Sequence, residues 1–361
     1  MRRLRRALLG VLCVTVMLVT GLASAVTSAQ AAVPDRWGFA FVDVFSGTPT
    51  LAHQAGSWSS ASVVTVSPGA TGQVKVVFPG IASPAGVAHV TAVSPNAEWC
   101  QLQTWLPSGP DEVALVQCYK YGGAPVFVPF TIVFEESSGT LPAPQALGYV
   151  HYNGGSVVTQ FNSTAGVDTV APGAVGVWTV TLPGLGSSSP EGGFQVTAVD
   201  RGQPARCKVG GWSAAIAAQI VQVVCYNATN APLRTGWTLT YQRQRAITGA
   251  ASPPKYFGYT LEVSPGTPGP YAPTPVGINF NPSGAPNTIK NFAVGREVTF
   301  PKIGYLRDHV QVTGFGSGPE YCNILKVWTT PPNDAVVSGI KCYNGVAVTP
   351  YRFFASYTSE K

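Results

Sequence analysis

A block that contains two cysteines, a tryptophan and a tyrosine recurs three times in this chain of 361 residues. In each copy a V-T-A or V-T-G string leads to a cysteine, then to a tryptophan five or six residues later, and then to a second cysteine followed by tyrosine. The copies are Val90–Tyr119, Val196–Tyr226 and Val312–Tyr343. A recurrence of this length predicts three copies of one domain, and the paired cysteines predict an oxidising compartment.

The similarity between the copies extends upstream of the cysteines. Val66–Gly72 and Val170–Gly176 share the pattern V-x-P-G-A-x-G and lead to the strings Val76–Gly80 and Val180–Gly184. The third copy keeps only V-T-F-P at Val298–Pro301, the counterpart of the second string. The first glycines of the copies, Gly38, Gly148 and Gly258, are 110 residues apart. A unit of about 100 residues can bury its own core, unlike the repeats of about 20–50 residues that depend on their neighbours.

The sequence therefore divides into an N-terminal segment and three homologous units. Pro-rich joints at 140–145 and 249–254 separate the units. Such short, semi-rigid joints predict domains that behave as beads with limited swing. The predicted parts are a signal peptide (1–31), unit 1 (32–139), unit 2 (146–248) and unit 3 (255–361).

Residues 1–31 have the pattern of a cleaved secretory signal peptide, with four arginines, a largely apolar run and an A-x-A cleavage signal at Ala29–Ala31. A membrane anchor is the alternative, because the apolar run approaches spanning length. The 22 basic residues of the chain include these four arginines, so the remainder carries 18 basic and 16 acidic side chains. So small an excess of positive charge argues against a nucleic-acid partner. The sequence predicts a secreted, extracellular protein with no membrane association after cleavage.

Removal of the signal peptide also removes Cys13 and leaves six cysteines, two in each unit. The repetition reduces the possible connectivities to one, in which the two cysteines of each copy are paired. Each bond closes a loop of about 20 residues and contributes on the order of 3 kcal/mol. Zinc is the competing use of paired cysteines, but the chain has no C-x-x-C and no histidine at a repeated position. The predicted disulfides are Cys100–Cys118, Cys207–Cys225 and Cys322–Cys342.

The chain is predicted to be all-β. Glycine (40 residues) and proline (31 residues) interrupt any long helix, and short runs rich in valine, threonine and aromatic residues lie between them. Ala114, Val116 and Cys118 alternate on one strand face, so the second cysteine is expected to point inward, in a hairpin or between facing sheets. We expect three tandem small β-sandwiches of Greek-key or jelly-roll-like topology, with one disulfide each. Cysteines 18 to 20 residues apart do not fit the immunoglobulin pattern.

The chain resembles secreted actinobacterial repeat proteins with no assigned function. The resemblance rests on an Ala-, Val-, Gly- and Pro-rich composition and on the F-P-G and V-T-A…C…W…C-Y strings. It covers the chain after the signal peptide and implies no activity.

No catalytic constellation recurs with the repeat. The four histidines occupy non-equivalent positions, and the chain contains neither G-x-S-x-G nor H-E-x-x-H. The adjacent acids Asp111-Glu112 and Glu135-Glu136 are private to unit 1. The sequence therefore predicts a non-enzymatic protein without a metal or a cofactor. A secreted hydrolase with one active unit is the remaining enzymatic alternative, because the members of a catalytic triad can be distant in sequence.

Six repeated aromatic residues are the candidate binding residues. The tryptophans either pack against the disulfides or form exposed platforms for sugar rings, and the tyrosines are expected to be half-exposed opposite the cysteines. The predicted function is an extracellular structural or binding module, and the alternative is a carbohydrate- or protein-binding array whose partner is a cell-wall glycan or another extracellular protein. The extra Pro/Gly-rich stretch at 264–275 is the expected place for a function private to unit 3. The candidates are Trp105, Trp212, Trp328, Tyr119, Tyr226 and Tyr343.

Overall fold

The computed structural model describes residues 35–59, 61–248 and 254–361. The predicted signal peptide, including Cys13, and most of the joint at 249–254 lie outside the described residues. No helix within the described ranges is long and apolar enough to cross a membrane. The helices found there are three short 3₁₀ turns, η1 (Leu51–His53), η2 (Val276–Ile278) and η3 (Pro331–Asn333). Strands dominate, so the predicted all-β class is confirmed.

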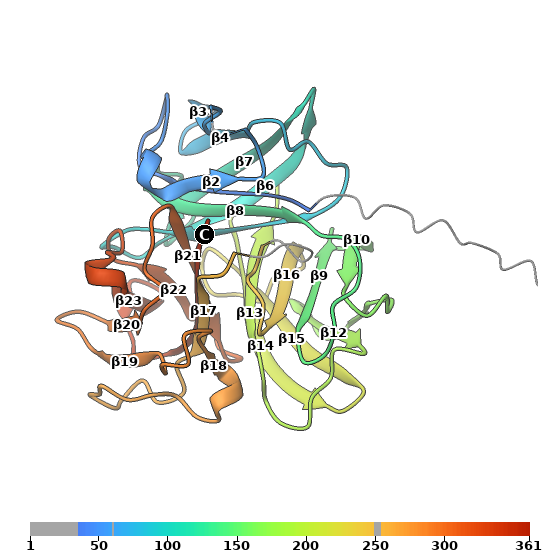
Figure 1. Cartoon of the computed structure of the whole chain (residues 1–361). Helices are drawn as coiled ribbons and strands as arrows, with labels where there is room; N and C mark the ends of the chain where they lie inside the picture. The colour runs from blue at the N-terminus through green and yellow to red at the C-terminus, as the bar shows by residue number, and fades with distance from the viewer. Residues whose placement is uncertain (1–34, 60, 249–253) are drawn as a thin grey trace, which may run out of the picture. The chain divides into compact units, whose positions relative to one another are not determined.

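Each unit contains eight of the described strands, and one short additional strand, β24 (Ala347–Val348), lies in unit 3. Figure 1 shows how the strands are arranged. The strands of unit 1 are β1 (Arg36–Val42), β2 (Gln54–Gly56), β3 (Thr65–Pro68), β4 (Gln73–Phe78), β5 (Val87–Ala92), β6 (Glu98–Ser108), β7 (Asp111–Lys120) and β8 (Phe130–Glu136). Those of unit 2 are β9 (Ala146–Tyr152), β10 (Val157–Asn162), β11 (Thr169–Pro172), β12 (Val177–Pro183), β13 (Gly193–Val199), β14 (Ala205–Ala215), β15 (Ala218–Asn227) and β16 (Gly236–Arg243). Those of unit 3 are β17 (Phe257–Leu261), β18 (Asn279–Phe280), β19 (Thr288–Asn291), β20 (Arg296–Phe300), β21 (Asp308–Phe315), β22 (Tyr321–Ile324), β23 (Ala335–Asn344) and β25 (Arg352–Ser359).

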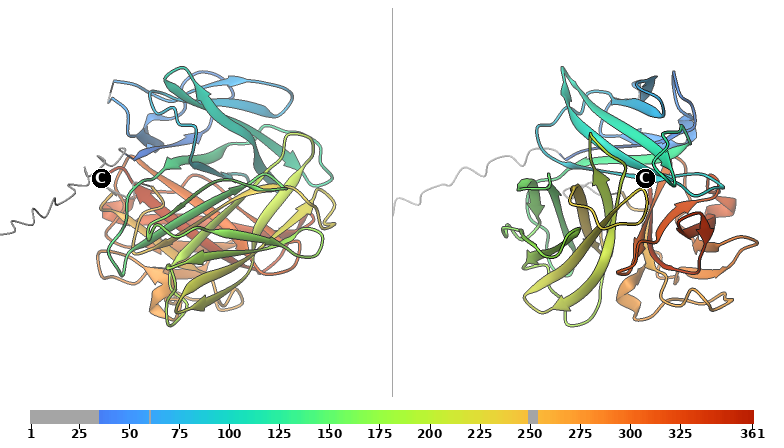
Figure 2. Two further views of the ribbon diagram at one scale, coloured as in Figure 1. Left: turned by 90° about the vertical axis from the view of Figure 1, so that its right-hand side faces the viewer. Right: turned by 180° about the vertical axis from the view of Figure 1, so that it is seen from behind.

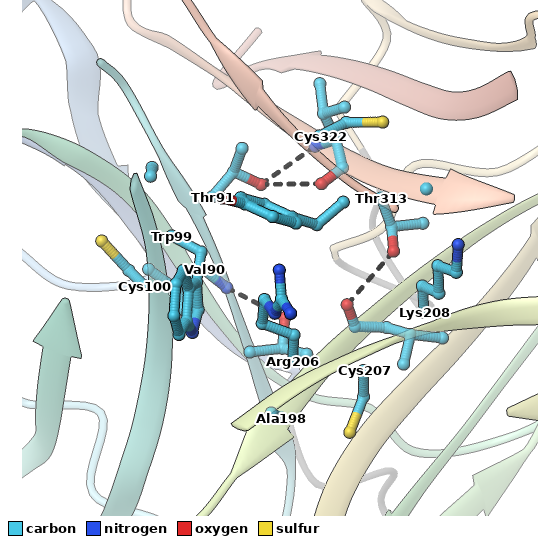
Figure 3. A pocket seen from close by; sticks show the side chains of 16 residues that line it. Val90, Thr91, Trp99, Cys100, Ala198, Arg206, Cys207, Lys208, Thr313 and Cys322 are labelled. Atoms are coloured by element: carbon cyan, nitrogen blue, oxygen red, sulfur yellow. Dashed lines mark hydrogen bonds between the residues drawn. The ribbon is translucent and has the colours of Figure 1, made fainter. Parts of the chain in front are cut away.

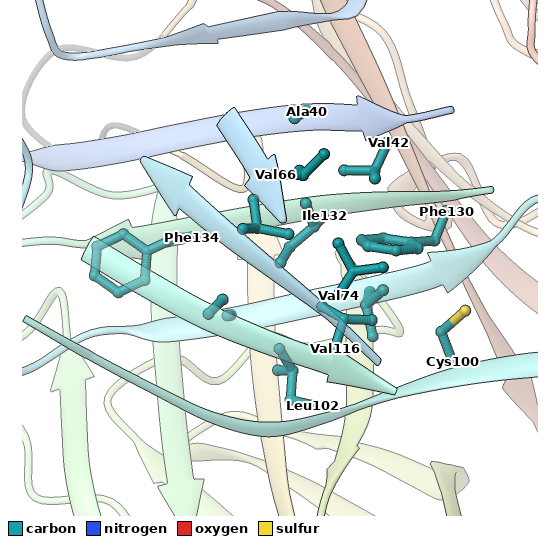
Figure 4. Close-up of a cluster of buried hydrophobic side chains, with 14 of the residues drawn as sticks. Ala40, Val42, Val66, Val74, Cys100, Leu102, Val116, Phe130, Ile132 and Phe134 are labelled. Atoms are coloured by element: carbon teal, nitrogen blue, oxygen red, sulfur yellow. The ribbon is translucent and has the colours of Figure 1, made fainter. Parts of the chain in front are cut away.

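Each unit forms two antiparallel four-stranded sheets, and the order of strands is the same in all three. In unit 1 the sheets are β2-β1-β8-β5 and β3-β4-β7-β6. The corresponding sheets are β10-β9-β16-β13 and β11-β12-β15-β14 in unit 2, and β18-β17-β25-β21 and β19-β20-β23-β22 in unit 3. Apolar side chains from both sheets fill the space between them, as Val74, Val116, Phe130 and Ile132 do in unit 1 (Figure 4). Three β domains with a two-sheet core are thus present.

Each unit holds one disulfide, and all three predicted pairs are confirmed. The bonded cysteines lie directly opposite each other on neighbouring strands, as Cys100 on β6 and Cys118 on β7 do. The bond therefore joins the two strands of a hairpin and not two facing sheets. The second cysteine of each pair is buried, as strand alternation predicts.

The three units do not behave as beads, so the expectation drawn from the Pro-rich joints is wrong. β13 of unit 2 runs parallel to β6 of unit 1, and β21 of unit 3 runs parallel to β14 of unit 2, so that sheets of different units merge. A third parallel bridge connects units 1 and 3 and closes the cycle. The three lobes lie around a common axis (Figure 2). The paired residues are Val199–Leu102, Phe315–Val209 and Val93–Ile324.

The hydrophobic cores also extend across the junctions. The core of unit 2 contains Leu261, Ile278 and Phe354 from unit 3. The core of unit 3 contains Phe41 and Val93 from unit 1. All five side chains are buried, so an isolated unit would expose apolar surface that its neighbour covers in the intact chain.

This sharing of cores predicts one cooperative unfolding transition for the intact chain. Residues 146–248 produced alone are expected to lose at least about 4 kcal/mol of stability, because burying each large apolar side chain contributes about 1.5–3 kcal/mol. Calorimetry of the intact chain and denaturant unfolding of the fragment measure the two quantities. Three separate transitions, or a fragment as stable as the intact chain, would contradict a shared core.

Candidate functional site

The axis around which the units meet is polar. β5, β13 and β21 lie along it, and nearly every residue of these strands is buried on both faces. In β5, Val90 and Ala92 belong to the core of unit 1, whereas His89 and Thr91 alternate with them and contact the neighbouring units. Buried polar side chains need hydrogen-bond partners, and here the other units supply them.

The threonines of the three V-T strings link the units in one direction around the axis. Each threonine hydroxyl bonds to the main chain of the valine that precedes the equivalent threonine in another unit. The bonds are from Val312 N–H to Thr91 Oγ1 (3.0 Å), from Val90 N–H to Thr197 Oγ1 (3.2 Å) and from Thr313 Oγ1 to the Val196 carbonyl (3.3 Å). The recurrence of V-T therefore has a structural cause.

The residue before each valine is also polar and buried, namely His89, Gln195 and Gln311. His89 Nε2 shares a hydrogen bond of 2.8 Å with Thr240 Oγ1 of unit 2. Thr91 Oγ1 donates to Gln311 Oε1 of unit 3 at 2.8 Å. Burial lowers the pKa of His89 to about 3. The imidazole is therefore neutral at neutral pH and matches the uncharged glutamines of the other units.

A cavity of about 50 Å³ lies on the axis (Figure 3). The V-T strings and the first cysteine of each disulfide line it. A buried water needs roughly 10–15 Å³, whereas sites for organic ligands measure about 300–1,000 Å³. The axial cavity is thus large enough for a few waters and too small for an organic ligand.

The residues immediately before the three first cysteines, Trp99, Arg206 and Tyr321, all line this cavity. Figure 3 shows Trp99 and Arg206. The guanidinium carbon of Arg206 lies 4.7 Å from the ring centroid of Trp99 and 4.2 Å from that of Tyr321. These cation–π contacts join one residue from each unit. Sequence reasoning missed this position, although a large side chain stands there in every copy.

The repeated tryptophans lie at the junctions and not on one shared surface. Trp328 is buried, and Trp105 and Trp212 are half-buried. Each packs against the core cluster that contains its own unit's cysteines, in line with the core alternative, and each also contacts a ring of a neighbouring unit. Measured between ring centroids, the contacts are Trp105 with His151 of unit 2 (4.4 Å), Trp212 with Phe354 of unit 3 (6.1 Å) and Trp328 with Phe41 of unit 1 (5.9 Å).

The tyrosines after the second cysteines also lie at junctions. Tyr119 and Tyr343 are buried in one aromatic cluster, so their expected half-exposure is wrong. Tyr343 donates to the Pro95 carbonyl of unit 1 at 3.2 Å. Tyr226 is half-exposed, as expected, and donates to the Ser317 carbonyl of unit 3. A neighbouring unit covers the strand face opposite the cysteines, and strand alternation alone does not reveal such a neighbour.

Asp308 and His309, an acid and a histidine adjacent in the sequence, are both buried. Asp308 Oδ1 accepts a hydrogen bond from Trp328 Nε1 at 2.9 Å and contacts His53 Nδ1 at 2.5 Å. The ring of His309 instead stacks on Phe39, at 4.5 Å between centroids. Within the described ranges, no three His, Cys, Asp or Glu side chains come together in a way that would hold a metal ion.

The junction between units 1 and 2 is open at the surface. A groove of about 500 Å³ lies there, next to the contact between Trp105 and His151. Polar side chains from both units form its walls, and they include Thr104, His151, Asn153, Asp200, Arg201 and Arg234.

The carboxylate in the groove is already engaged. Asp200 Oδ1 accepts hydrogen bonds from the N–H groups of Gly202 (2.8 Å) and Gln203 (3.0 Å). Its Oδ2 accepts a hydrogen bond of 2.7 Å from Thr235 Oγ1. Asp200 therefore shapes the turn at the end of β13.

The groove presents cations and one neutral imidazole. Arg201 Nη2 donates to Thr104 Oγ1 across the junction at 2.7 Å, and Arg234 is exposed. Burial lowers the pKa of His151 to about 4, so at neutral pH its ring offers one donor and one acceptor. This arrangement suits a ligand with hydroxyl groups and negative charge.

Comparison of the chain with protein-family models, with curated proteins and with solved structures gives no match.

The threonine links at the axis make a prediction about stability. Thr91→Val is expected to lower the free energy of unfolding by about 1–3 kcal/mol, because the Val312 N–H and the Gln311 side chain lose a buried partner. Thr65→Val makes the same change at an exposed position of β3 and is expected to change stability by less than about 0.5 kcal/mol. Urea unfolding measures both variants, and equal effects would contradict the role given to the axis.

The histidine at the axis predicts a pH dependence. Burial lowers the folded-state pKa of His89 from its usual 6.5 to about 3. Between these values the unfolded chain binds more protons, so His89 makes stability fall as the pH falls from 6.5 toward 3. His89→Gln places in unit 1 the residue that units 2 and 3 carry, and removes this dependence. Between pH 7 and pH 4 the variant is expected to lose up to about 3 kcal/mol less stability than the wild type. Parallel losses in both proteins across this range would show that the histidine is not responsible.

Proposed function

We propose that the protein is an exported, non-enzymatic binding module that acts as one rigid body and binds an acidic cell-wall glycan in the groove between units 1 and 2. Three disulfides indicate an oxidising, extracellular-type environment. The signal-peptide pattern of residues 1–31 supports export.

The observation that carries the proposal is the way the repeated residues are used. The repeated threonines and tryptophans bond or pack across junctions, and their side chains are engaged there. A specific ligand is then expected to contact residues that differ between copies. His151 is such a residue. It is the third residue after Gly148, and the residues at the same distance from the equivalent glycines of units 1 and 3 are Phe41 and Leu261.

The chemistry of the groove favours an acidic saccharide. Hydroxyl groups pair with the neutral imidazole of His151 and with amide side chains, and carboxylates or phosphates pair with arginine. Arg234 is exposed at the groove and is free of the structural bond that Arg201 makes to Thr104. Another extracellular protein is the alternative partner.

A pull-down on cell-wall glycans tests this proposal. Arg234→Ala is expected to weaken binding about tenfold, because a hydrogen bond to a charged group is worth about 1.5–3 kcal/mol. Lys75→Ala removes an equal charge from an exposed position on β4, outside the groove, and is expected to bind like the wild type. Binding should also weaken as salt increases.

Two results would overturn the proposal. Equal binding by the two variants would place the glycan outside the groove. Release of new reducing ends or of free acid from the bound glycan would show turnover and would make the protein an enzyme.

A further inference from the structure

Units 1 and 2 close one end of their sandwiches with a glycine turn. Gly72 and Gly176 have positive φ, and their carbonyls accept hydrogen bonds from Cys118 N–H (3.3 Å) and Cys225 N–H (2.8 Å). A Cβ at Gly72 would lie 2.6 Å from Val126 N, so the backbones are in direct contact here. The turn thereby covers the second cysteine of each unit.

The equivalent turn of unit 3 is one residue shorter. Pro68 pairs with Val74 and Pro172 with Trp178, whereas Asn291 pairs with Arg296. In this shorter turn Phe292 N–H donates to the Gly295 carbonyl at 3.1 Å. A pocket of about 260 Å³ occupies the space between the turn, Cys342 and residues 348–351.

The lining of the pocket is mainly apolar, with Pro265, Phe292, Ile340, Val348, Pro350 and Tyr351 among its residues. An engineered apolar cavity of about 150 Å³ holds benzene. The pocket of unit 3 is thus large enough for one ring and a short side chain.

Arg296 is the charged residue in the wall of this pocket. Arg296 is 6% exposed, and its Nε donates to Glu262 Oε2 at 2.7 Å. Its Nη1 donates to the Thr267 carbonyl at 2.8 Å. The remaining nitrogen, Nη2, is buried and has no hydrogen-bond partner among the described residues. A buried donor without a partner favours a ligand that carries an acceptor.

The stretch at 264–275, which is private to unit 3, builds this polar end. Tyr271 pairs with Ile289 of β19, and its hydroxyl donates to Glu262 Oε1. The Pro268 carbonyl accepts a hydrogen bond from Asn291 N–H. Lys326 Nζ lies 5.5 Å from the ring centroid of Phe292, which lines the pocket, and adds positive charge there.

From this geometry we propose that unit 3 holds a second binding site, which takes a small monocarboxylic acid with a ring-sized apolar body. The ring lies against Phe292, Ile340 and Val348 in the pocket. The carboxylate lies toward Arg296 Nη2 and the Lys326 ammonium, since a guanidinium fork and a cation both favour this group. The site is separate from the groove between units 1 and 2, and neither proposal depends on the other.

Titration of the purified full chain with 3-phenylpropionate, followed by isothermal calorimetry and saturation-transfer NMR, tests the site. The neutral analogue 3-phenylpropanol has the same ring and chain and is expected to bind at least about tenfold more weakly, because it lacks the charge.

Two tryptophan variants locate the binding. Val348→Trp fills the pocket from an exposed position and is expected to weaken binding at least about tenfold. Val346→Trp is the control, because Val346 is exposed on the same hairpin but does not line the pocket. Thermal unfolding of both variants checks that the fold is retained.

The proposal fails if Val348→Trp binds the acid as well as Val346→Trp does. Equal affinities for the acid and the alcohol would contradict the proposed binding of the carboxylate by Arg296 and Lys326. The absence of binding up to the solubility limit of the acid would overturn the site as a whole.

Discussion

The hydrogen bonds between each V-T threonine and the main chain of another unit are the constraint on which the rest of this structure depends. They lie at a buried axis, where a donor or acceptor without a partner costs about 1–3 kcal/mol. An open row of three units would satisfy two of these links and leave the third unmade. A closed cycle satisfies all three, from Val312 to Thr91, from Val90 to Thr197 and from Thr313 to Val196. Closure also explains why the units share sheets and cores.

The copies nevertheless differ at particular positions beside the axis. Equivalent residues of three units meet there, and three arginines would repel one another. Arg206 instead lies between the rings of Trp99 and Tyr321, so one cation is combined with two aromatic faces. His89 likewise occupies the position that Gln195 and Gln311 hold in the other units, and burial keeps it neutral by lowering its pKa to about 3. Pseudo-symmetry of the backbone therefore coexists with asymmetry of the side chains.

The sequence predicted what local spacing and alternation determine. The all-β class, the three disulfides and the inward second cysteines follow from residue period and cysteine repetition. The junctions were not predictable in this way, because their partners belong to different units and no local pattern connects them. Trp105 and Tyr343 are ordinary strand aromatics in the sequence, and only the structure shows their contacts with His151 of unit 2 and Pro95 of unit 1. The Pro-rich joints led to the wrong expectation of separate beads for the same reason, since a short linker permits a closed cycle of units as readily as an open row.

The residues that close the three-unit cycle limit the positions at which a ligand can bind. Residues that close the cycle cannot change without loss of buried hydrogen bonds, so the repeated positions have little freedom to adapt to a ligand. Positions outside the cycle are free of that demand. At the position where units 1 and 3 carry the apolar Phe41 and Leu261, unit 2 carries His151, which places a polar ring in the groove between units 1 and 2. The shortening of one turn at Asn291–Arg296 exposes a pocket that the other two units fill with backbone. Each change leaves the threonine links intact, so a single copy can acquire a site while the three-unit frame keeps its stability.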